Sequence, residues 1–191
     1  DDWTDGGIDD CPEEIQALIP GVELILTLTK KYAALVMNPP YMGKGNMNEE
    51  LNLYIKENYE NGKTDLCTAM MLMQSDRTVE KGYYANIIPP SWMFLTQFEL
   101  MRSNIINNQT ITSLLHLSRG VFGADFGSVS CTIQNYKREN AVGTYYKLVK
   151  RTFQEFEQDH LRQLFEKSLA DNNFKFDFSS YSKSITSIEF S

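Results

Sequence analysis

The sequence is poor in the residues that build disulfide frameworks and metal centres. It contains three widely spaced cysteines, Cys11, Cys67 and Cys131, and two histidines, His116 and His160. This spacing matches neither a disulfide scaffold nor a zinc site, so we expect no bound metal and a reducing, cytoplasmic compartment. The chain also lacks an apolar run of about 18 residues, which a membrane-spanning helix requires, so we expect no association with a membrane.

Basic residues are missing from the first 29 positions. This stretch carries eight acidic residues and no lysine or arginine, whereas the remainder holds 18 basic and 17 acidic residues and is close to neutral. The net charge of −7 therefore comes from the start of the chain, and it neither predicts nor excludes nucleic-acid binding by a local basic face. Its composition predicts an acidic loop or insertion over residues 1–21.

A glycine-rich nucleotide-binding loop is missing as well. Gly43-Lys44-Gly45 is not continued as a P-loop or as a Gly-x-Gly-x-x-Gly pattern, because position 48 is Asn. Residues 122–127 contain two glycines but not the compact spacing of such a loop. The segment around Lys44 is either a cover over a binding site, with Lys44 on a backbone phosphate, or a mobile connection.

The sequence does contain a short apolar strand that ends in Asn38-Pro39-Pro40-Tyr41. Residues 35–37 predict a buried strand, and the prolines keep the chain extended beyond it. Because proline has no N–H, this tip presents acceptors: the Asn38 side-chain oxygen and the Asn38 and Pro39 carbonyls, followed by the Tyr41 ring. Such a tip suits a flat substrate that carries an amino group.

The apolar periodicity predicts a mixed α/β fold. Helices are expected over residues 22–31, 49–59, 65–79, 94–107 and 153–169, and strands over 35–37, 83–88, 111–117, 129–136 and 144–149. We expect the 65–79 helix to bury Leu66, Ala69, Met70, Leu72 and Met73. With 42% hydrophobic residues the chain can form a core. The order of elements fits the second half of a doubly wound sheet flanked by helices, with residues 152–191 as a connector.

Asn38-Pro39-Pro40-Tyr41 resembles the catalytic motif of S-adenosylmethionine-dependent amino-methyltransferases, above all the N6-adenine DNA methyltransferases. Lys31-Tyr32, Met42-Gly43 and Pro90-Ser91-Trp92 resemble the BREX (PglX-like) phage-defence methyltransferases, relatives of the type II restriction–modification methyltransferases. The resemblance covers residues 31–137. It implies that residues 22–151 form the C-terminal, substrate-side half of a Rossmann-like methyltransferase, and that the chain is a fragment without the cofactor loop and target-recognition domain.

The resemblance also implies roles for individual residues. An adenine flipped out of double-stranded DNA would stack between Tyr41 and Phe122, with Phe126 as the fallback for the second aromatic. Its amine would donate to the Asn38 side chain and the Pro39 carbonyl, which also border the methyl donor, S-adenosylmethionine. Lys44 would contact the DNA backbone. Defence-system proteins are further expected partners, and His116 is expected to be structural.

Three other functions remain open from the sequence. The same tetrapeptide occurs in methyltransferases that modify a glutamine amide in translation release factors and in some RNA methylases, so Asn38 to Tyr41 cannot separate these substrates. A fragment without a cofactor loop could also be a non-catalytic module that binds DNA or a partner protein. Phe122 and the Pro90-Ser91-Trp92 segment favour DNA.

Overall fold

The computed structural model describes residues 12–117, 119–120, 127–139, 141, 143–148 and 158–170. Contacts divide the chain into two compact units, Asp1–Lys31 and Tyr32–Ser191. The first unit contains α1 (Glu13–Gln16) and α2 (Ile19–Thr29). Helix α2 begins three residues before the expected position because Pro20 lies in its first turn, where the missing N–H costs no helical hydrogen bond. Residues 1–11 lie outside the described residues, and the rest of the predicted acidic loop, residues 12–21, contains α1 and the first turn of α2.

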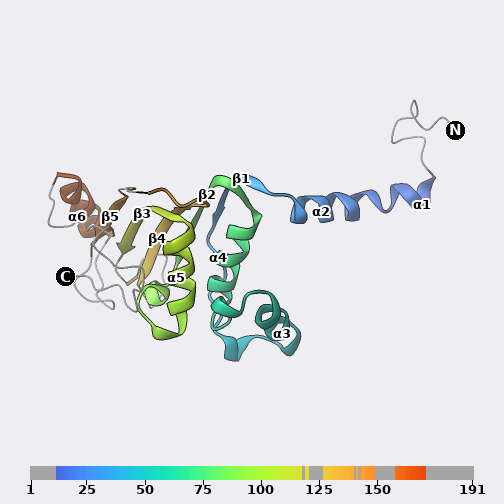
Figure 1. Cartoon of the computed structure of the whole chain (residues 1–191), viewed down its shortest axis with the longest axis horizontal. Coiled ribbons are helices and arrows are strands. Elements are labelled where there is room, and N and C mark those ends of the chain that lie inside the picture. The colour runs from blue at the N-terminus through green and yellow to red at the C-terminus, as the bar shows by residue number, and fades with distance from the viewer. Residues whose placement is uncertain are drawn as a thin grey trace. The chain divides into compact units, whose positions relative to one another are not determined.

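The second unit is built on a five-stranded mixed sheet in the order β1-β2-β4-β3-β5 (Figure 1). The strands are β1 (Tyr32–Met37), β2 (Thr78–Ile88), β3 (Thr110–Leu117), β4 (Ser128–Gln134) and β5 (Thr144–Lys147). β1 runs parallel to β2 and β3 parallel to β5, whereas β4 is antiparallel to both of its neighbours. This arrangement confirms the mixed α/β class predicted from the sequence.

Helices lie on both faces of the sheet. The helices of this unit are α3 (Glu49–Asn58), α4 (Leu66–Arg77), α5 (Glu99–Asn108) and α6 (Gln158–Ala170), with short 3₁₀ turns at Lys44–Asn46, Glu60–Gly62, Pro90–Met93 and Thr96–Phe98. Phe165 of α6 contacts Tyr146 of β5, whereas the neighbouring Tyr145 faces the main core, so α6 lies on the face opposite that core. α4 packs against β2 and α5 against β3 (Figure 1). The main core lies beneath these helices and includes Tyr84, Ile88, Trp92, Met101, Leu114 and Ile133.

β1 is less buried than its sequence predicts. Only Tyr32, Leu35 and Met37 are partly covered, and Val36 is 84% exposed. Among the described residues β1 has β2 as its only strand neighbour, so its outer edge is unpaired there. The expectation of a buried strand is therefore wrong for the Val36 face, because neither a helix nor a second strand covers that side within the part of the chain described.

The junction between α4 and β2 also differs from the prediction. The helix ends at Arg77 instead of residue 79, and the strand begins at Thr78 instead of residue 83, so Gly82 lies inside the strand. Gly82 lies where the β1–β2 register shifts, and a Cβ there would approach the Ala33 carbonyl oxygen to 2.8 Å. Lys81 beside it has φ 65°. A bulge that brings two backbones together requires glycine at this position.

Two of the three cysteines lie in the main core. Cys67 and Cys131 are free and buried, and burial raises the pKa of Cys131 to about 12. Within the described residues, no three His, Cys, Asp or Glu side chains are grouped to hold a metal ion. None of the helices in the part of the chain described is long and apolar enough to cross a membrane.

His116 gives the fold a predictable pH dependence. Its side chain lies in β3 and is 2% exposed. Burial, with a smaller effect of Lys147, lowers the pKa of His116 to about 4 from its usual 6.5. The unfolded chain therefore binds the proton more tightly, and stability falls as the pH drops below 6.5. We expect a loss of about 1 kcal/mol between pH 7 and pH 5.5, measured by urea unfolding of the chain.

The other histidine supplies the control for this measurement. His160 is exposed on α6, so His160→Leu should keep the loss of stability between pH 7 and pH 5.5. His116→Leu should remove it, because no titrating ring is left in the core. Equal pH dependence in the two variants would contradict the assignment to His116.

Candidate active site

The predicted motif lies at the carboxyl end of the first strand of the sheet. β1 ends at Met37, and the next residue, Asn38, is exposed. Pro39 is buried, whereas Pro40 is exposed and Tyr41 is partly buried against the main core. In open α/β sheets ligands bind in the crevice outside the carboxyl ends of the strands, so the motif occupies the position expected of a site.

The Tyr41 hydroxyl holds two groups together at this edge. It lies 2.9 Å from the Asn38 side-chain oxygen and 2.9 Å from the Ile87 carbonyl oxygen near the end of β2. A phenol has a single proton, so it donates to one of these acceptors at a time. Burial, and secondarily Cys67, raises the pKa of Tyr41, which keeps that proton on the oxygen at neutral pH. The hydroxyl thus fixes the Asn38 amide at the end of the sheet.

The chain after Tyr41 is tied to the start of α4. The Asp65 side chain caps this helix by accepting from Cys67 N at 3.0 Å, and it also lies 3.3 Å from Met42 N. Leu66 N donates to the Met42 carbonyl at 2.9 Å. These bonds join the motif to α4, and Lys44 follows on an exposed turn.

Phe122 and its fallback Phe126 lie outside the described residues. In sequence they fall between β3, which ends at Leu117, and β4, which begins at Ser128. Leu117 pairs with Ser128, and Val129 pairs with Ile88 at the end of β2. Both strand ends therefore lie at the same edge of the sheet as the motif, and the role of Phe122 stays a prediction.

Two residues that organise the site were not found from the sequence. Ile87 contributes only its carbonyl, and its 46-residue separation from Tyr41 leaves no local signal. Asp65 had a signal, because an aspartate directly before an apolar run is a typical helix N-cap. That pattern predicts the start of α4, but it does not predict the contact with Met42.

A mixed five-stranded sheet packed with helices, whose first strand ends at an exposed amide, has the fold of a Rossmann-like methyltransferase. Residues 9–122, more than half of the chain, match the family model described as Eco57I restriction-modification methylase. The chain therefore belongs to the Eco57I restriction-modification methylase family.

Individual relatives agree with this assignment. The chain is 30% identical over 168 residues to the adenine-specific methyltransferase BrxX of Escherichia coli O9:H4 (strain HS), covering 85% of this chain and 14% of BrxX. It is 33% identical over 126 residues to the adenine-specific methyltransferase PglX of Lacticaseibacillus casei (strain Zhang), covering 64% of this chain and 10% of PglX. The chain thus spans a small part of these curated relatives.

A solved structure shows the same fold. The Type ISP restriction-modification enzyme LlaGI, as a nuclease-deletion mutant in complex with a DNA substrate mimic, superposes with a TM-score of 0.59 at 18% identity. The match covers 85% of this chain and 18% of that one. At this identity the likeness concerns the fold alone.

Proposed function

We propose that the full-length protein methylates the N6 amine of adenine in double-stranded DNA, in restriction–modification or phage defence. The observation that carries this proposal is the Asn38 amide, exposed at the end of β1 and fixed by the Tyr41 hydroxyl. Its chemistry fits an exocyclic amine, which needs acceptors for its two hydrogens. The adenine-specific names of BrxX and PglX support adenine as the base.

The motif would position the amine rather than deprotonate it. The adenine leaves the duplex because its N6 cannot be reached within the stack. Its two N–H bonds point at the Asn38 side-chain oxygen and the Pro39 carbonyl, which aims the nitrogen lone pair out of the ring plane. Tyr41 stacks on one face and Phe122 on the other, with each stacked face worth about 1–3 kcal/mol. The proton becomes acidic only as the methyl group arrives, so no general base is required.

The Asn38 oxygen can accept from Tyr41 and from the substrate amine at the same time. It lies 2.9 Å from the Tyr41 hydroxyl, and an amide oxygen has two lone pairs. One lone pair would accept the incoming N–H while the other keeps the bond from Tyr41. The hydroxyl would therefore hold the amide in place when the amine binds.

The residues present fit the near side of an S-adenosylmethionine site. Asn38 is exposed and Pro39 follows it at the end of β1, whose outer edge is unpaired in the described residues. Asn38 and Pro39 would border the cofactor, and a cofactor-binding half would extend the sheet from β1. The cofactor supplies an electrophilic methyl group; the chain's own residues orient the amine towards it.

Product analysis tests this function. The full-length protein is incubated with S-adenosylmethionine carrying a labelled methyl group and, separately, with unmethylated plasmid DNA, total RNA and a glutamine-containing release-factor peptide. Digestion and mass spectrometry should find N6-methyladenine in DNA alone. Label in RNA or on glutamine would replace the proposal by one of the other amino-methyltransferases, and no label in any substrate would favour a binding module.

Two substitutions of Tyr41 distinguish the contribution of its hydroxyl from that of its ring. Tyr41→Phe keeps the stacking surface but removes a neutral hydrogen bond to the Asn38 amide, so we expect kcat for DNA methylation to fall about tenfold with KM for DNA little changed. Tyr41→Ala should also raise KM, since it removes the stacked face. Steady-state kinetics of the full-length protein measures both.

The exposed Tyr83 on β2 provides the matched control, and Tyr83→Phe should leave both constants unchanged. If Tyr41→Phe retained the wild-type kcat, the hydroxyl would have no part in positioning Asn38.

A further inference from the structure

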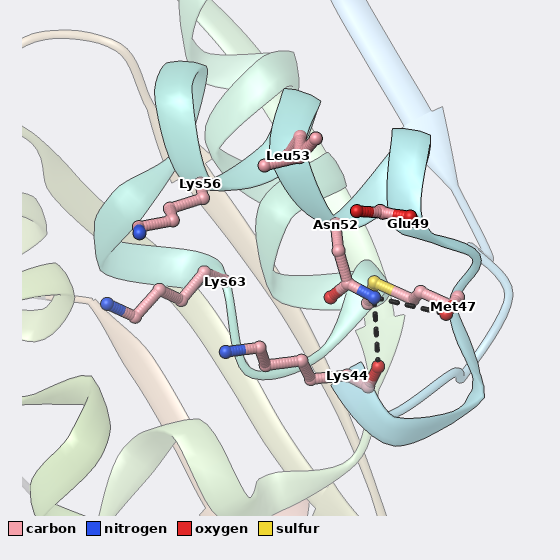
Figure 2. A pocket seen from close by; sticks show the side chains of 7 residues that line it. All are labelled: Lys44, Met47, Glu49, Asn52, Leu53, Lys56 and Lys63. Atoms are coloured by element: carbon pink, nitrogen blue, oxygen red, sulfur yellow. Dashed lines mark hydrogen bonds between the residues drawn. The ribbon is translucent and has the colours of Figure 1, made fainter.

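An open, positively charged pocket lies on the segments that follow the motif. It has a volume of about 420 Å³ and is lined by Lys44, Met47, Glu49, Asn52, Leu53, Lys56 and Lys63. Figure 2 shows the ammonium groups of Lys44, Lys56 and Lys63 on the same side of the pocket, each extending from a different segment. Three cations line it against one carboxylate, Glu49.

Hydrogen bonds hold these three segments together. Lys44 N donates to the Thr64 carbonyl at 3.0 Å, which joins the turn that carries Lys44 to the loop that carries Lys63. The Asn52 side-chain nitrogen of α3 lies 3.0 Å from the Met47 carbonyl and 3.3 Å from the Lys44 carbonyl (Figure 2). The lysine backbones are therefore fixed before any ligand arrives, so binding costs mainly the ordering of their side chains.

Packing of the second loop adds to this rigidity. A Cβ on Gly62 would lie 2.9 Å from Ala69 N, so the loop before Lys63 sits directly on the backbone of α4. Thr68 Oγ1 also donates to the Gly62 carbonyl at 2.7 Å. These contacts place Lys63 at a constant position relative to α4.

The charges near the pocket leave a net positive field. Glu60 forms an ion pair with Lys63, and both side chains remain partly exposed, at 55% and 35%. The pKa of Glu60 is lowered chiefly by its hydrogen bond to Lys63, and the charges of Lys63, Lys56 and Lys44 also lower it. An exposed pair of this kind is weak and exchanges readily for a stronger anion.

The pocket is close to the motif in the chain. Lys44 follows Tyr41 by three residues, which bounds their Cα separation at about 11 Å. One DNA strand advances about 3.4 Å per nucleotide, so this reach corresponds to about three nucleotides. Phosphodiester oxygens are the anions that a DNA substrate brings within that distance.

We propose that Lys44, Lys56 and Lys63 bind one phosphodiester group of the target strand, within about three nucleotides of the flipped adenine. This inference rests on the proposed function, because it takes the substrate to be DNA. The pocket holds the DNA backbone on one side of the base. The stacking energy on Tyr41 then stabilises the flipped base and is not needed to hold the backbone.

The test removes the two lysines that the motif itself does not position. Lys56→Gln/Lys63→Gln should raise KM for duplex DNA about tenfold at 0.15 M salt and leave kcat within about twofold. The slope of log Kd against log salt should become shallower by about 1. The matched control is Lys81→Gln/Lys137→Gln, which removes one lysine from the first half of β2 and one that follows β4, both at the end of the sheet opposite the motif; we expect it to match the wild type.

A duplex with single neutral phosphates identifies the ligand as backbone. The target sequence is first found by sequencing the DNA that the wild-type protein methylates. A set of duplexes with this sequence is then made, and each duplex carries a single methylphosphonate at one of the three positions on either side of the adenine. Wild type and control should lose about tenfold in affinity at one position, and the lysine variant should lose clearly less there, because only Lys44 still contacts that phosphate. If the variant stayed as sensitive as the wild type at every position, the pocket would not hold a backbone phosphate.

These outcomes separate the two proposals. DNA methylation by the wild type together with unaffected lysine variants overturns the phosphate site alone. Failure of the wild type to methylate any DNA overturns the proposed function and this inference with it.

Discussion

Asn38→Ala in the full-length protein should lower kcat for DNA methylation by about 100- to 1,000-fold. The amide oxygen is held by the Tyr41 hydroxyl at 2.9 Å, so it is oriented before the substrate arrives. Loss of one preorganised group of this kind costs about 2.7–4 kcal/mol of transition-state stabilisation in other enzymes. Steady-state methylation with labelled S-adenosylmethionine measures the effect, and KM for DNA should change much less than kcat.

Three comparisons make the result specific. Asn38→Asp keeps an acceptor oxygen and should retain more activity than Asn38→Ala. Asn107→Ala, at an exposed position on α5, should retain full activity. Asn38 is itself exposed, so its substitution should change the free energy of unfolding by less than about 0.5 kcal/mol. Methylation by Asn38→Ala within about threefold of the wild type would falsify the assignment.

The sequence predicts the frame of the site well because its signals are local. An apolar run followed by two prolines predicts a strand, and β1, which ends directly before Asn38, confirms it. The strands at 110–117 and 128–134 are also close to their predicted bounds. These elements alternate apolar and polar residues, or end at proline or glycine.

The buried face of α4 could not be predicted from the sequence. The expected set was Leu66, Ala69, Met70, Leu72 and Met73, whereas the helix buries Cys67, Thr68, Ala69, Met71 and Gln74. Apolar residues surround this helix on nearly every side, so the period of 3.6 does not single out one face. The buried face is set by contacts with other segments. Thr68 Oγ1 donates to the Gly62 carbonyl, and Thr78 Oγ1 donates to the Gln74 carbonyl at 2.7 Å.

The lysine pocket was only partly visible in the sequence. Lys44 stood out because it follows the motif, but Lys56 lies on a helix and Lys63 on a loop, and no spacing rule connects them. Their convergence depends on backbone bonds such as Lys44 N to Thr64 O. Contacts of this kind form only when α3 and α4 have folded back on the motif.

Arg102→Met should lower the free energy of unfolding by about 2–4 kcal/mol. Arg102 is 0% exposed, and its Nη1 atom lies 2.8 Å from the Trp92 carbonyl and 2.6 Å from the Leu95 carbonyl. Burial lowers the pKa of the guanidinium, and Glu99 opposes this effect. Methionine fills similar space but cannot donate, so two hydrogen bonds from a charged group are lost, at about 1.5–3 kcal/mol each. The Leu95 carbonyl keeps its bond from Phe98 N, and a charge is no longer buried, which offsets part of the loss.

The effect should extend to the active site. The bonded turn, Pro90–Met93, directly follows β2, and β2 carries the Ile87 carbonyl that anchors Tyr41. Urea unfolding followed by circular dichroism measures the stability. Arg162→Met is the matched control, because Arg162 forms an exposed pair with Glu166 in α6, and such a pair is worth about 0.5 kcal/mol or less. If the two variants unfolded at the same urea concentration, the buried guanidinium would not be what holds this turn.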